Sequence, residues 1–114
     1  MENQSTRQLK VSRQLQRDLA EIFREKGTQS FGGAMITVTN VRISPDLSVA
    51  RVFISIFPSE KSGEVFQIVE TSAKSLRGEL GKRVSKQLRI VPELVFNIDD
   101  SLDYIEKIDG LLKK

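Results

Sequence analysis

The chain has 114 residues, with 18 lysine and arginine residues against 15 aspartate and glutamate residues, and it contains no histidine, cysteine or tryptophan. This length fits a single domain spanning 1–114, which buries about two-thirds of its unfolded surface without disulfides or structural metal. The missing residue types exclude His and Cys nucleophiles, thiol redox pairs and the usual zinc sites. We therefore expect no catalytic residues, cofactor, metal site or small-molecule substrate.

The first twenty residues do not form a signal peptide, because Arg7, Lys10, Arg13 and Arg17 interrupt any apolar run. The apolar stretches elsewhere are of strand length, far short of the roughly 18 residues that a membrane span needs. We expect a cytoplasmic protein without a membrane partner.

The basic and acidic residues are segregated, so the net charge of +3 results from cancellation. Residues 7–17 hold four basic side chains and no acid, residues 74–89 hold six basic and one acidic, and residues 90–109 hold six acidic and one basic. Basic blocks on a folded domain indicate a polyanionic partner, although a solvated helix face is the simpler explanation for 7–17 alone. The candidate binding residues are Arg7, Lys10, Arg13, Arg17, Lys74, Arg77, Lys82, Arg83, Lys86 and Arg89.

The N-terminal region predicts an amphipathic helix over residues 5–26, because its apolar residues recur at steps of three and four. These apolar residues are Val11, Leu15, Leu19, Ile22 and Phe23. A glycine-rich loop at 27–34 follows the helix.

Two strands are predicted at 35–44 and 49–57, joined by a Ser-Pro-Asp turn into an antiparallel hairpin. The apolar phase of the first strand shifts across Asn40, which predicts a β-bulge. Phe53 and Phe57 alternate with the apolar residues of the second strand. We expect a core or helix-covered position for both rings, and therefore little stacking of bases on them.

The second half of the chain opens with an apolar stripe over residues 64–88. The stripe rotates around the helix axis by more than one straight helix allows, which predicts two helices joined by a kink. Pro92 then closes off the helix, and residues 94–98 alternate as a third strand. Asp99-Asp100-Ser101 caps a short C-terminal helix. This order predicts an α+β fold in which helices cover one face of a three-stranded sheet.

The predicted order is that of a type II KH domain, α-β-β-α-kink-α-β, and two blocks carry a narrower resemblance. Residues 44–48 (SPDLS) and 88–96 (LRIVPELVF) resemble the ribosome-binding factor A family, and the match extends over nearly the whole chain. The resemblance implies a KH-like RNA-binding assembly factor, not an enzyme, that binds the small ribosomal subunit and its rRNA. It would assist maturation of the 5′ region of precursor small-subunit (16S) rRNA, chiefly in the cold. We expect the protein to be a monomer, and we expect neighbouring ribosomal proteins to help it to recognise the rRNA.

The family marks the kink between its helices with Ala-x-Gly, and that consensus is missing here. The corresponding kink positions are Ser72, Ala73 and Lys74. Residues 78–81 (GELG) match the G-x-x-G clamp of ordinary KH domains, which holds the nucleic-acid backbone. However, Leu80 lies on the apolar stripe and Glu79 would meet phosphates, which argues against a clamp.

Two other functions stay open from the residues themselves. The acidic C-terminal segment, 99–109, is suited to docking a basic partner, or to shielding the basic surface, which would make the chain a protein-interaction module. Asp99 and Asp100, with Glu93, are carboxylates of the kind that hold Mg²⁺ in nucleases. A helix cap explains the Asp-Asp-Ser sequence more simply.

Overall fold

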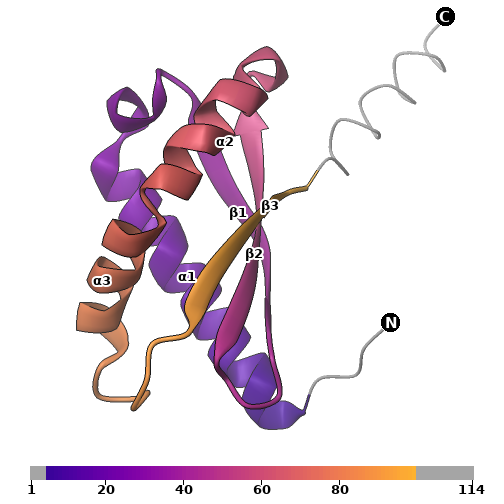
Figure 1. The fold of residues 1–114 in the computed structure, drawn as a ribbon, viewed down its shortest axis with the longest axis vertical. Helices are drawn as coiled ribbons and strands as arrows, with labels where there is room; N and C mark the ends of the chain where they lie inside the picture. The colour runs from indigo at the N-terminus through magenta and orange to yellow at the C-terminus, as the bar shows by residue number, and fades with distance from the viewer. Residues whose placement is uncertain (1–4, 100–114) are drawn as a thin grey trace, which may run out of the picture.

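The computed structural model describes residues 5–99, in which three α-helices pack on a three-stranded sheet (Figure 1). The elements in order are α1 (Thr6–Lys26), η1 (Thr28–Phe31), β1 (Met35–Ile43), β2 (Val49–Phe57), η2 (Ser59–Lys61), α2 (Ser62–Thr71), α3 (Ala73–Val84) and β3 (Glu93–Ile98). The C-terminal helix predicted after Asp99 lies outside the described residues.

The central strand of the sheet is β2, which pairs antiparallel with β1 and parallel with β3. Parallel pairing requires a crossover connection, and α2 and α3 provide it. All three α-helices lie on the same face of the sheet (Figure 1). The predicted α+β class is therefore confirmed, with the strand and helix order of a KH-like domain.

The first helix, α1, begins at a capping box: the amide of Gln8 donates to Ser5 Oγ at 3.1 Å, and the amide of Ser5 donates to Gln8 Oε1 at 2.9 Å. The Gln8 side chain also donates to the carbonyl of Ile43, which ties this end of the helix to β1. The helix ends at Gly27, whose positive φ of 74° suits glycine. Its buried residues are Ser12, Leu15, Leu19, Ile22 and Phe23.

The predicted β-bulge is present in β1, where the register with β2 shifts between Val38 and Asn40. The extra residue, Thr39, returns the apolar side chains to the core face, so that Val38 and Val41 are both buried. Gln16 of α1 donates to the carbonyls of Val38 and Thr39, at 3.3 and 3.2 Å. A helix side chain thus supports the irregular backbone of the bulge.

The turn between β1 and β2 is organised around the carboxylate of Asp46. Its Oδ1 accepts the hydroxyls of Ser44 and Ser48, both at 2.7 Å, and the amide of Ser48 at 3.1 Å. These hydrogen bonds lower the pKa of Asp46 to about 2, with the Ser48 hydroxyl the largest cause. Leu47 adopts a left-handed φ of 61° while its side chain packs against the core.

The apolar stripe of the second half divides between α2 and α3, which meet at Ser72, the first of the three positions predicted for the kink. Ser72 donates its amide to the carbonyls of Ile68 and Val69. The stripe residues Val65, Val69, Leu76, Leu80 and Val84 are fully buried. Helix α3 ends at Val84, earlier than the stripe indicated, because a turn bonded to the Val84 carbonyl carries Leu88 toward α1.

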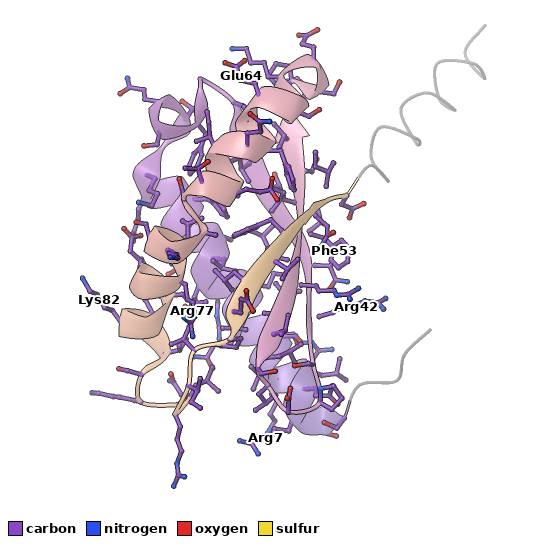
Figure 2. All side chains as sticks on the ribbon, in the orientation of Figure 1. Arg7, Arg42, Phe53, Glu64, Arg77 and Lys82 are labelled. Atoms are coloured by element: carbon purple, nitrogen blue, oxygen red, sulfur yellow. The ribbon has the colours of Figure 1, made fainter. Side chains whose placement is uncertain are left out.

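The expectation that Phe53 and Phe57 are covered by core or helices is wrong. Both lie on the face of the sheet away from the helices, where Phe53 is half-buried and Phe57 is 64% exposed (Figure 2 labels Phe53). Alternate residues of β2, such as Val52 and Ile54, face the helices. Because every α-helix among residues 5–99 packs on that one side, the opposite face meets solvent.

Candidate nucleic-acid interface

The first basic block lies on the outer side of α1. Because the apolar residues of α1 pack inward, Lys10, Arg13 and Arg17 are left on the solvent side, and all three are exposed. Arg7 is exposed in the first turns of α1, at one end of the molecule (Figure 2). Arg24 continues the row along the same side.

The second basic block lies on α3 and on the segment that follows it. Lys74 and Lys82 are exposed on α3, and Lys82 points away from the helix into solvent (Figure 2). Lys86 and Arg89 are exposed in the connection between α3 and β3. These four ammonium and guanidinium groups have no acidic partner among residues 5–99.

Ion pairs join the two blocks at the contact between α1 and α3. Arg83 of α3 donates to Glu21 Oε2 at 2.8 Å and to Glu25 Oε1 at 2.6 Å, and Lys26 Nζ lies 3.0 Å from Glu79 Oε1. The hydrogen bond from Arg83, followed by its charge, lowers the pKa of Glu25, and the same pair raises the pKa of Arg83. Glu21, Glu25 and Glu79 are therefore matched by cations from within the protein.

The start of α1 and the segment after α3 come together in the fold. A hollow of about 100 Å³ is lined by Arg7 and Lys10 on one side and by Gln87 and Leu88 on the other. Lys86 and Arg89 flank that pair in the chain, so two basic blocks far apart in sequence share one surface. We call this the helical basic surface: Arg7, Lys10, Arg13, Arg17, Lys82, Lys86 and Arg89.

A groove runs on the other side of α3, against the segment that leads into β3. Lys74 and Arg77 line a hollow of about 450 Å³ there and an adjoining one of about 630 Å³. Arg77 lies between α3 and β3 (Figure 2) and donates to the carbonyls of Val91, at 2.7 Å, and Pro92, at 3.2 Å. Its guanidinium thus holds the wall of the groove in place.

Comparison with known proteins shows which family this chain belongs to. The family model described as ribosome-binding factor A matches residues 7–112. The chain belongs to the ribosome-binding factor A family. It is 40% identical over 111 residues to ribosome-binding factor A of Cytophaga hutchinsonii, covering 97% of this chain and 84% of the relative.

Solved structures of the ribosome-binding factor A family share the fold. The crystal structure of the protein from Thermus thermophilus has a TM-score of 0.67 and 27% identity, covering 80% of this chain and 94% of that chain. A homology model of the Thermus thermophilus factor, fitted into a cryo-EM map of a 30S complex, has a TM-score of 0.62 and 28% identity. The match covers 77% of this chain and 90% of that chain.

In this member of the family, the G-x-x-G sequence at residues 78–81 lies inside α3 and not in a loop between helices. Leu80 is fully buried, and a Cβ at position 81 would lie 3.0 Å from Val91 Cγ2. Gly81 therefore allows the close approach of the segment before β3. A helical backbone has no free amides here to hold a phosphate, unlike the clamp loop of ordinary KH domains.

Of the ten candidate residues, seven lie on the helical basic surface and Lys74 lines the groove on the other side of α3, whereas Arg77 and Arg83 have partners within the protein. Sequence reasoning did not select Arg42 and Arg51, which lie on the uncovered face of the sheet. The signal for Arg51 was available, since it alternates with the buried residues of β2.

Two further observations concern the other possible classes of function. No three carboxylates within residues 5–99 converge in the manner of a metal site, and the carboxylate of Asp99 accepts a hydrogen bond from Thr39 Oγ1 at 2.6 Å. Asp100 lies outside the described residues. Over that same span, no helix combines the length and apolar character that crossing a membrane would require.

Proposed function

We propose that this protein is an assembly factor that binds the small ribosomal subunit and contacts its rRNA through the helical basic surface. The observation that carries the proposal is the meeting of the two basic blocks on one side of the helical layer, in a member of this family. The Thermus thermophilus relative fitted into a map of a 30S complex supports the identity of the partner.

Phosphate contacts by exposed lysines and arginines account for the proposed binding. Such contacts release counterions, so affinity falls steeply as salt rises. Arg77 and Arg83 act indirectly in this proposal, because they hold the groove wall and the α1–α3 contact in place. RNA shape and backbone are recognised by this surface, with neighbouring ribosomal proteins completing the site.

The consequence of binding, in this proposal, is maturation of the 5′ region of precursor 16S rRNA, with the largest effect in the cold. The protein performs no chemistry itself and acts as a monomer in the cytoplasm. The family membership supports these points, together with the absence of histidine and cysteine from the chain.

The decisive experiment is cosedimentation with purified small subunits over a range of salt concentrations. Lys82→Glu is expected to weaken binding and to reduce the slope of log affinity against log salt by about one. The matched control is Lys61→Glu, which reverses an exposed lysine just before α2, whose Glu64 lies far from Arg7 (Figure 2). Because Lys61 Nζ donates to the Gly32 carbonyl at 3.1 Å, thermal unfolding must verify that this variant is folded. Equal effects of the two reversals would contradict the proposed surface.

Two outcomes bear on the rest of the proposal. Association that survives nuclease treatment at full strength would favour the alternative of protein docking. In cells lacking the protein, 5′-extended precursor rRNA is expected to accumulate, more at low temperature. Wild-type protein should reverse that accumulation, and Lys82→Glu should reverse it poorly.

A further inference from the structure

The uncovered face of the sheet carries its own pattern of side chains. It is formed by alternate residues of the three strands and lies on the side away from the helices, where Figure 2 shows both Phe53 and Arg42. We call it the open sheet face. The residues of its central part are Asn40, Arg42, Arg51, Phe53, Val95 and Asn97.

Two arginines occupy directly opposite positions on this face. Arg42 of β1 and Arg51 of β2 are direct cross-strand partners. Neither has an acidic side chain within ion-pair distance among residues 5–99. Like charges placed directly opposite each other destabilise a sheet. A pair left without internal compensation forms a site for an anion, and a bidentate fork suits phosphate.

An aromatic ring adjoins this pair. Phe53 follows Arg51 on the same face of β2, about 7 Å further along the strand. Asn40 of β1 and Asn97 of β3 flank it in register. The side-chain carbonyl of Asn40 accepts the amide of Val41 at 2.9 Å, which leaves its NH₂ group to donate. The ring thus has Arg51 beside it on its own strand and an asparagine on each neighbouring strand.

We propose that the open sheet face binds unpaired RNA, with one base stacked on Phe53 and the adjoining phosphate held by Arg42 and Arg51. Aromatic stacking accepts any base, and amides hydrogen-bond to base edges. The proposal rests on the proposed function in that the partner is RNA, but it assigns a second face, which binds single strands. The charge of the arginine pair favours RNA over an apolar protein partner.

The test is fluorescence anisotropy of a short labelled oligouridine with the full-length chain. Phe53→Leu is expected to weaken binding about tenfold, whereas Phe53→Tyr retains it because the ring remains. The matched control is Phe57→Leu, the same substitution on the same face of β2 at the end of the strand. Unchanged affinity for Phe53→Leu, or a larger loss for Phe57→Leu, overturns the assignment.

The arginine pair is tested in the same way. Arg42→Gln combined with Arg51→Gln is expected to reduce the salt slope by about 0.7, as for one phosphate contact on a single strand. An unchanged slope would overturn the phosphate role. Ultraviolet crosslinking of the oligouridine, followed by mass spectrometry, should place the crosslink on the peptide with Phe53, and a crosslink confined to α1 or α3 contradicts the proposal.

The two proposals fail separately. If Phe53→Leu leaves the affinity for oligouridine unchanged, while the protein still cosediments with small subunits and Lys82→Glu still weakens that binding, only the proposal for the open sheet face is rejected. Oligouridine binding that depends on Phe53, without cosedimentation, would remove only the proposed function. Thermal unfolding of each variant verifies that the protein is folded in every comparison.

Discussion

Arg83 Nη2 lies 2.6 Å from Glu25 Oε1, and this ion pair joins α3 to α1. The second guanidinium nitrogen of Arg83 reaches Glu21 at 2.8 Å, so one side chain spans two acidic residues on adjacent turns of α1. The pair explains why neighbouring basic residues differ in role. Lys82 points to solvent, whereas Arg83 points to the other helix.

Arg83→Gln is predicted to lower the Tm more than Lys82→Gln, because it leaves Glu21 and Glu25 without their cation. The pKa of Glu25 is lowered, so the stability from the pair is present above the ordinary glutamate pKa of 4.5 and is lost as the pH falls through the lowered value. Thermal unfolding of both variants at neutral and acidic pH measures this. A Tm difference between Arg83→Gln and wild type that persists at low pH would contradict the ion-pair explanation.

Two glycines of α3 are predicted to respond differently to alanine. Gly78→Ala should stabilise the protein by about 1 kcal/mol, because position 78 is exposed and a Cβ there has no neighbour within 4 Å. Gly81→Ala should gain less or lose, because its Cβ would lie 3.0 Å from Val91 Cγ2. Urea unfolding gives both values.

The same glycine variants test the clamp. Gly78→Ala should leave cosedimentation with small subunits unchanged, since residues 78–81 are helical. If this variant bound small subunits much more weakly while being more stable, the G-x-x-G sequence would have to take part in RNA binding.

Asp46→Asn is predicted to lower the Tm by a few degrees at neutral pH, because the turn between β1 and β2 loses the charge that accepts three hydrogen bonds. The pKa of Asp46 is lowered from 3.8 to about 2, so its stabilisation is present above pH 3.8 and is lost as the pH falls through 2. The Tm values of Asp46→Asn and wild type, plotted against pH, should therefore converge near pH 2. Parallel curves down to that pH would show that the carboxylate charge does not matter.

Gln16→Ala is predicted to cost about 1 kcal/mol, because its amide donates to two carbonyls at the β1 bulge. Gln14→Ala is the control, since it makes the same change on α1 at a side chain that lines the hollow with Leu88, away from β1. Urea unfolding compares the two. Equal costs would indicate that the bulge needs no support from α1.

The local elements follow directly from residue patterns. The apolar spacing of α1, the turn around Asp46 and the phase shift across Asn40 can each be recognised within one short segment of the chain, and the structure has all three features. The residue pattern did not predict where α3 ends, because Leu88 belongs to the apolar stripe but reaches α1 from a turn.

The candidate site was predictable in composition but not in arrangement. Charge counting selected the basic residues of α1 and α3 from the chain alone. It had no means to separate Lys82 from Arg83, because the acidic partners of Arg83 lie about sixty residues away, on α1. It also assigned Phe53 to a covered position, since alternation shows that a strand has two faces but not which elements cover them.

The sequence by itself determined the class of fold, the family and the absence of histidine and cysteine chemistry, because these depend on composition, periodicity and short motifs. Only the tertiary structure decided that two basic blocks share one surface, that Arg77 and Arg83 bind partners within the protein, and that Phe53 and Arg42 lie on the uncovered face. The physical reason is that packing three helices on one side of a three-stranded sheet creates both a joined helical surface and an uncovered face. Neither is a property of any single segment.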